Sequence, residues 1–343
     1  MKNIEDSPFL ERILRHSFSH ATRSSASVCL STLAVFVFLT GQCMGQDILV
    51  KKGDSIAFLG DSITAKGWAP GGYIKLVIDG LEKQGVKATP IPAGVSGNKS
   101  NDMLDRLDRD VLNKNPTWMT LSCGVNDVWH GKNGVPLDDY KKNISTIVEK
   151  AQAQGINVII LTATPIGEDD NANNQKLADY NEFLRTLAKK HHFLLADLSE
   201  DFKNVLGKLS THKDSRYLTV DGVHMNPEGN VLMAKGCLRA FGLSEAQLKD
   251  VEQSWLSQAN TAQINVYPFD PRPKFGITLG QFRALKTIAG ERHTPIVNLT
   301  RSLWLQALSQ AVQDHVDEPV LDAEQVKKDA NAKLLATIEK LTK

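Results

Sequence analysis

The chain has 343 residues, of which 41% are hydrophobic and 23% are charged, and its formal net charge is +1. This composition is ordinary for a globular protein, and the length is sufficient for one large domain or two smaller ones. A nearly neutral chain has no global field that would attract nucleic acid or an anionic membrane surface, so neither is expected as a partner.

Residues 1–45 have the pattern of a signal peptide. Basic residues between positions 12 and 23 precede an uncharged stretch whose apolar centre, residues 28–39, has the length of a signal-peptide core. Cys43-Met44-Gly45 is a small-x-small site, after which cleavage is expected. The alternative is an uncleaved N-terminal membrane anchor, although the apolar centre is shorter than a spanning helix needs. We expect export to the periplasm or the extracellular space.

Apolar runs that alternate with helical patterns follow the N-terminal segment. The expected strands are residues 56–59, 86–91, 118–123, 156–163 and 193–197. The expected helices are residues 73–83, a charged helix that ends near 112, and residues 138–154, 173–191 and 227–241. Strands that alternate with helices predict a parallel sheet covered on both faces. The expected fold is therefore α/β, a flavodoxin-like three-layer α/β/α sandwich with about five parallel strands.

This α/β unit is expected to span residues 46–242, and residues 243–343 have a different character. Helical patterns over 244–257, 299–316 and 323–341 predict a helical C-terminal extension. Residues 260–273 contain three prolines and are expected to be irregular. The sequence does not distinguish an extension that docks on the main domain from one that mediates self-association, and the oligomeric state also stays open.

Residues suited to acyl transfer lie at the ends of apolar runs or in tight turns. Ser62 follows the first expected strand at its carboxyl end, where open α/β sheets bind their ligands. His224 can serve as the base, and Asp221, three residues earlier, can orient the imidazole. The backbone N–H of Ser62, the backbone N–H of Gly97 and the side chain of Asn126 can stabilise an oxyanion. The adjacent Asp61 and Asp127 are interpreted as structural hydrogen-bond acceptors that fix their turns.

In their order, Ser62, Gly97, Asn126 and His224 resemble the four blocks of the GDSL, or SGNH, hydrolase family, and Asp221 fits the Asp-x-x-His of that family. The resemblance covers about residues 54–242. It implies a serine ester hydrolase that uses Ser62, Asp221 and His224 as its triad and requires neither a metal nor an organic cofactor. Met225 stands where a proline commonly follows the histidine, which leaves the chemistry intact.

Family members include lipases, thioesterases and carbohydrate acetylesterases. Export and two tryptophans in loops beside the site, Trp68 and Trp129, favour an acetylated glycan as the substrate. Core packing is the simpler interpretation of both indoles, and a sugar-stacking platform is the functional one. Two alternatives stay open, namely a lysophospholipase or thioesterase of the same family and a catalytically inactive binding module.

Two cysteines, Cys123 and Cys237, lie outside the leader-like segment. Each falls in an apolar pattern, which favours two buried thiols, and a disulfide between them is the alternative in an exported protein. No spacing typical of metal ligands occurs in the sequence.

Overall fold

The structure is a computed structural model that describes residues 47–209, 216–265, 274–316 and 322–343. Residues 1–45, expected to be a signal peptide or an anchor, lie outside the described residues. Within the described ranges, no helix is both long enough and apolar enough to cross a membrane.

Five parallel strands form one sheet in the order β2-β1-β3-β4-β5. The strands are β1 (Ser55–Gly60), β2 (Thr89–Gly94), β3 (Trp118–Ser122), β4 (Asn157–Leu161) and β5 (Leu194–Ala196). Nearly every residue of β1 and β3 is buried, which explains why these central strands are continuous apolar runs rather than alternating ones. The expected α/β fold with about five parallel strands is confirmed.

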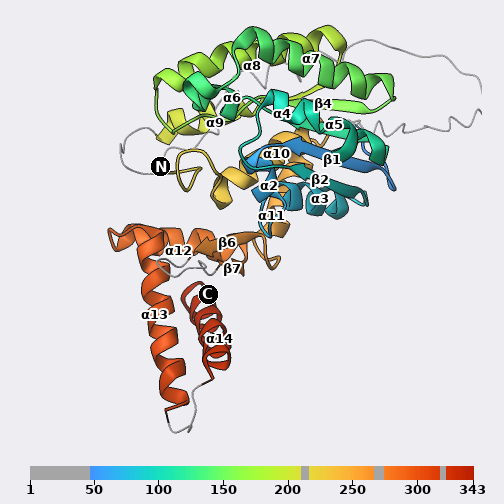
Figure 1. The fold of residues 1–343 in the computed structure, drawn as a ribbon. Helices are drawn as coiled ribbons and strands as arrows, with labels where there is room; N and C mark the ends of the chain where they lie inside the picture. Colours follow the sequence, from blue (N-terminus) through green and yellow to red (C-terminus); the bar gives the residue numbers. More distant parts are fainter. Residues whose placement is uncertain (1–46, 210–215, 266–273, 317–321) are drawn as a thin grey trace, which may run out of the picture. The chain divides into compact units, whose positions relative to one another are not determined.

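Helices cover both faces of the sheet (Figure 1). Those of the α/β unit and the segment after it are α2 (Ser62–Gly67), α3 (Tyr73–Lys83), α4 (Ser100–Asp105), α5 (Leu107–Asp110), α6 (Val125–Trp129), α7 (Leu137–Ala153), α8 (Ala172–His191), α9 (Leu198–Leu209), α10 (Pro227–Ala240) and α11 (Glu245–Trp255). Helices α7 and α8 pack together on one face, and α3 packs against α10 on the other. The α/β unit thus forms three layers.

Two elements of the α/β unit differ from the expected ones. Strand β2 begins three residues later than expected and contains Pro90 and Pro92. It is an edge strand of the sheet. The backbone N–H groups of Thr89 and Val95 donate toward β1, and because alternate residues point to opposite sides, the nitrogens of the two prolines face the open edge. A proline there removes no hydrogen bond between strands. The charged helix expected to end near 112 is interrupted at Arg106, which separates α4 from α5.

The C-terminal part contains a β-hairpin besides its helices. Strands β6 (Ala262–Asn265) and β7 (Lys274–Ile277) pair antiparallel, although the sequence predicted an irregular segment there. The helices are α12 (Leu279–Glu291), α13 (Ile296–Asp314) and α14 (Ala323–Leu341), which share a second hydrophobic core with the hairpin. The apolar side chains of α11 belong to the first core, with the sheet. The division at residue 242 remains a prediction.

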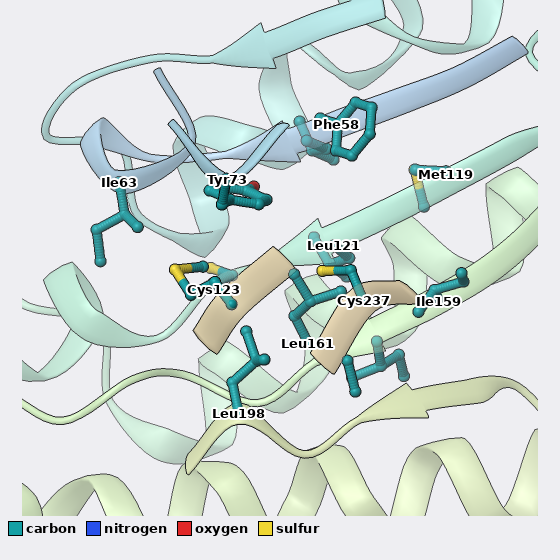
Figure 2. Close-up of a cluster of buried hydrophobic side chains, with 14 of the residues drawn as sticks. Phe58, Ile63, Tyr73, Met119, Leu121, Cys123, Ile159, Leu161, Leu198 and Cys237 are labelled. Atoms are coloured by element: carbon teal, nitrogen blue, oxygen red, sulfur yellow. The ribbon is translucent and has the colours of Figure 1, made fainter. Parts of the chain in front are cut away.

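Cys123 and Cys237 are both buried and unpaired. They lie in the first hydrophobic core, in the cluster that includes Leu121, Leu161 and Leu198 (Figure 2). Burial raises the pKa of both thiols, that of Cys237 to about 12. The preferred interpretation of two buried thiols is confirmed, and the disulfide alternative does not hold.

Candidate active site

The sheet topology brings three of the expected site segments to one edge. The chain leaves β1 for β2 on one side and returns to β3 on the other, so a switch point lies between β1 and β3. Ser62 follows β1, Gly97 follows β2 and Asn126 follows β3. Since parallel strands end at the same edge, these residues meet at the crevice where such sheets bind ligands.

Ser62 is the first residue of α2, and its neighbours fix its position. The carboxylate of Asp61 caps the helix by accepting the Ile63 N–H at 2.8 Å. The backbone N–H of Ser62 has no acceptor among the described residues, as expected in the first turn of a helix. Gly94 at the end of β2 permits this packing, because a Cβ there would lie 2.3 Å from the Ala65 nitrogen.

Ser62, His224 and Asp221 form a hydrogen-bonded relay. The Ser62 hydroxyl lies 2.9 Å from His224 Nε2, and His224 Nδ1 lies 2.6 Å from Asp221 Oδ2. The second Asp221 oxygen accepts the backbone N–H groups of Val223 and His224 at 3.1 and 2.8 Å. Burial opposes ionisation of Asp221, but the hydrogen bonds from His224 and Val223 outweigh it and lower the pKa. This is the geometry of a nucleophile, a base and a group that orients the base.

A second carboxylate holds the loop that carries the histidine. Glu168, in the loop after β4, accepts the backbone N–H groups of Tyr217, Leu218 and Thr219 at 2.6, 3.0 and 2.7 Å. It also accepts the Thr219 hydroxyl at 2.6 Å. Glu168 therefore fixes the backbone directly before Asp221. The role of Glu168 could not be predicted from the sequence, because nothing in a Gly-Glu-Asp-Asp loop distinguishes it from a solvated charge.

Gly97 and Asn126 are the expected oxyanion donors beside Ser62, and they differ in how their N–H groups are occupied. Gly97 has a φ of +81°, a left-handed conformation that favours glycine, and its N–H has no acceptor in the part of the chain that the structure describes. Asn126 is only 5% exposed, and its Nδ2 donates to the Asn98 carbonyl at 3.0 Å and to Asp61 Oδ2 at 3.3 Å. A substrate oxygen can replace the longer of these two contacts.

The two buried aspartates beside the site accept hydrogen bonds from backbone N–H groups, as expected of residues that fix their turns. Besides capping α2, Asp61 accepts from Asn126, and Asp127 accepts the Ser100 N–H at 2.9 Å and the Cys123 thiol at 3.4 Å. Burial raises the pKa of Asp61 to about 7, and the charge of Asp127 adds to this rise. Burial also raises the pKa of Asp127.

The two tryptophans differ in their surroundings. Trp68 packs partly buried against the first core, and the Lys75 ammonium lies 3.6 Å from the centroid of its ring. That face of the indole is therefore covered. Trp129, the last residue of α6, is 47% exposed and offers its ring to solvent. Among the described residues, no cluster of His, Cys, Asp and Glu has a composition that could hold a metal ion.

Comparison with known proteins gives matches over the same region. The profile of the GDSL-like Lipase/Acylhydrolase family matches residues 58–232, a segment that contains all five site residues. An acetylxylan esterase of Geobacillus stearothermophilus is 26% identical over 216 residues, which cover 56% of this chain and 96% of that protein. The crystal structure of the acetyl xylan esterase AlAXEase has 36% sequence identity and a TM-score of 0.51, and the match covers 54% of this chain and 98% of that one. The uncharacterized lipoprotein YqeF of Bacillus subtilis (strain 168) is 25% identical over 235 residues, 60% of this chain and 94% of that protein.

Proposed function

The chain belongs to the GDSL-like lipase/acylhydrolase family and is a carboxylic ester hydrolase, and we propose that it removes acetyl groups from a carbohydrate through a Ser62-His224-Asp221 triad. The observation that carries the catalytic part is the relay from the Ser62 hydroxyl, 2.9 Å from His224 Nε2, to Asp221, 2.6 Å from His224 Nδ1. Acyl transfer needs a nucleophile, a base and an orienting group in this order.

In the first half-reaction, Ser62 Oγ attacks the ester carbonyl while His224 Nε2 takes its proton. Asp221 keeps Nδ1 protonated and stabilises the imidazolium that forms. The tetrahedral oxyanion accepts hydrogen bonds from the N–H of Ser62, the N–H of Gly97 and Nδ2 of Asn126. When the intermediate collapses, the alcohol leaves with the proton from His224.

In the second half-reaction, water attacks the acetyl-Ser62 ester with His224 as the base, and the same donors hold the second oxyanion. Acetate then leaves, and Ser62 regains its proton. The steps need an imidazole that can both accept and donate, which the hydrogen bond between His224 and Asp221 supports.

The carbohydrate part of the proposal draws on the relatives and on Trp129. Two of the matched proteins are named acetylxylan esterases. Trp129 lies three residues after Asn126 and exposes nearly half of its surface, so its ring can stack on the apolar face of a pyranose. We assign this platform to Trp129 and not to Trp68, whose ring is covered by Lys75.

A panel of substrates tests this proposal. We expect the wild type to prefer acetylated xylooligosaccharide over octanoyl esters, and a preference for octanoyl esters would favour the lysophospholipase or thioesterase alternative.

Trp129→Ala should raise KM on the oligosaccharide by roughly 3–10-fold, the effect of losing about 1 kcal/mol of stacking. Turnover of p-nitrophenyl acetate, which has no sugar, should stay unchanged, and Trp129→Phe, which keeps a ring, is the matched control. Equal losses on both substrates would mean that Trp129 only packs its loop.

Export is part of the proposal as well. Residues 1–45 have the pattern of a signal peptide, and a relative that matches 60% of this chain is named a lipoprotein. An exported enzyme would meet polymeric glycans outside the cytoplasm, which agrees with the proposed substrate.

A further inference from the structure

Arg106 is a buried cation beneath the loops of the candidate active site. It lies at the break between α4 and α5 and is only 6% exposed. Burying a charge is costly unless the charge is paired and its hydrogen bonds are satisfied. The partners of this guanidinium therefore indicate what the position does.

The planar guanidinium of Arg106 donates hydrogen bonds to three segments of the chain. Nη2 of Arg106 donates to the Gly60 carbonyl at 2.9 Å, and Nη1 donates to the Ala93 carbonyl at 2.9 Å. Nε donates to the Asn98 side chain at 2.6 Å. Nη1 also contacts Asp110 at 3.0 Å, which supplies the opposite charge. Arg106 thus fastens the ends of β1 and β2 and the loop after β2 to one another.

These acceptors adjoin the proposed oxyanion donors. Asn98 follows Gly97 in the chain, and its carbonyl accepts Nδ2 of Asn126 at 3.0 Å. Gly60 lies two residues before Ser62. Ser62 and Gly97 are therefore within two residues of a group that Arg106 binds, and Asn126 donates to the backbone carbonyl of Asn98, whose side chain Arg106 binds.

The ion pair with Asp110 alone would not need this arrangement. An Arg–Asp pair four residues apart forms readily on a helix surface, in water. Here the guanidinium is buried, and it donates three further hydrogen bonds to the segments that carry the proposed site residues. Only a guanidinium presents donors in several fixed directions of one plane; a lysine ammonium is a point charge that cannot reach all four acceptors.

We propose that Arg106 is the positioning residue of the oxyanion hole, an inference that rests on the proposed ester hydrolysis. It fixes the separation between the N–H groups of Ser62 and Gly97 and the Asn126 amide. Oxyanion donors act through preorganised placement, so a small displacement lowers the rate of the chemical step more than it weakens substrate binding.

The first test is Arg106→Lys, which keeps the charge, measured with p-nitrophenyl acetate. We expect kcat to fall by about 10²-fold, in the range for one lost oxyanion donor, and KM to change by less than about three-fold. Arg185→Lys is the matched control, because Arg185 also forms a part-buried bidentate pair, with Asp197, but contacts none of the site residues. It should lower the melting temperature without lowering kcat. A folded Arg106→Lys protein with wild-type kcat would overturn the proposal.

A double-mutant cycle separates positioning from a general loss of structure. If Arg106 acts through the oxyanion hole, Arg106→Lys should cost much less in kcat when Asn126 is already alanine. An undiminished cost in that background would contradict the proposal. Should Arg106→Lys fail to fold, Asn98→Ala replaces it in the cycle, since it removes the acceptor of Nε and leaves the charge pair with Asp110 intact.

The two proposals fail in different ways. A wild-type protein without esterase activity that depends on Ser62 would overturn the proposed function. An active wild type with an equally active Arg106→Lys variant would overturn only the role of Arg106.

Discussion

Asn126 is fixed by acceptors from two different segments of the chain. Its amide donates to the Asn98 carbonyl at 3.0 Å and to the Asp61 carboxylate at 3.3 Å. Such a side chain is ordered before substrate binds, so it pays little entropy when it binds the oxyanion. The amide is therefore suited to act in the transition state rather than in ground-state binding.

Asn126→Ala should lower kcat by about 10²–10³-fold and leave KM nearly unchanged, because one preorganised donor is lost. Steady-state kinetics on p-nitrophenyl acetate measure both parameters. A change mainly in KM would show that Asn126 binds the substrate in its ground state instead.

Asp61 predicts a pH dependence of stability. Burial raises its pKa from 3.8 to about 7, so the folded protein holds this proton over a range in which the unfolded chain has lost it. The free energy of unfolding should therefore fall as the pH rises through this range and level off above it. The difference between the two pKa values corresponds to roughly 4 kcal/mol.

Asp61→Asn removes this titration, with Asp127 and Cys123 left in place as the nearby titratable groups. Urea unfolding at about pH 5 and about pH 8 should show the wild type losing stability relative to Asp61→Asn as the pH rises. A difference that is the same at both pH values would contradict a raised pKa of Asp61.

The residues proposed to act as nucleophile, base and orienting group could be predicted from the sequence, whereas two residues that support the site, Arg106 and Glu168, could not. Ser62, Asp221 and His224 have a recognisable type and spacing, and the structure brings them into contact. Arg106 and Glu168 have partners 46 and 49 to 51 positions away, and each lies in a polar stretch. Their roles depend on partners that the fold brings close, and a local sequence pattern cannot predict such partners.

At the scale of elements, the loop that carries His224 is held both by an isolated β-bridge between Thr219 and Met225 and by the carboxylate of Glu168. Four hydrogen bonds join this carboxylate to residues 217–219, directly before Asp221. Hydrogen bonds to a charged group contribute about 1.5–3 kcal/mol each, so Glu168 is a main determinant of the loop conformation.

Glu168→Gln places an amide N–H₂ against N–H donors and should release this loop. We expect kcat to fall about 10-fold and the protein to lose about 2–4 kcal/mol of stability. Thermal unfolding and p-nitrophenyl acetate kinetics measure these effects, and Asp170→Asn in the same loop is the control. If kcat is unchanged in Glu168→Gln, the position of the histidine does not depend on this carboxylate.

The bounds of elements could be predicted where a pattern is long and periodic. Helix α3 spans the expected residues 73–83, because its apolar side chains recur with the helical period. Strand β2 was misplaced, since its two prolines read as breakers, and only its position at the sheet edge explains why they are tolerated. The β6–β7 hairpin was missed for a similar reason, because the prolines at 268, 271 and 273 dominate the pattern around it.

At the scale of the whole molecule, the chain carries segments on both sides of the region that matches the family. The profile covers residues 58–232, and the second hydrophobic core is built entirely from residues beyond it. The matched relatives do not indicate the role of that C-terminal part, because each match covers 60% of this chain or less.

For the N-terminal segment, we expect cleavage after Gly45 during export, so the mature protein should begin at Gln46. N-terminal sequencing of the protein recovered from outside the cytoplasm measures this directly. An intact Met1 in the exported protein would favour the membrane-anchor alternative.

The proposed ester hydrolysis requires Ser62 to be a nucleophile that His224 activates. The most direct measurement is covalent labelling with a fluorophosphonate probe, followed by mass spectrometry of the labelled peptide. We predict near-complete labelling of the wild type on the peptide that contains Ser62, strongly slowed labelling of His224→Ala, and none of Ser62→Ala. Labelling of Ser62→Ala to the wild-type extent, or at a different residue of the wild type, would contradict the claim.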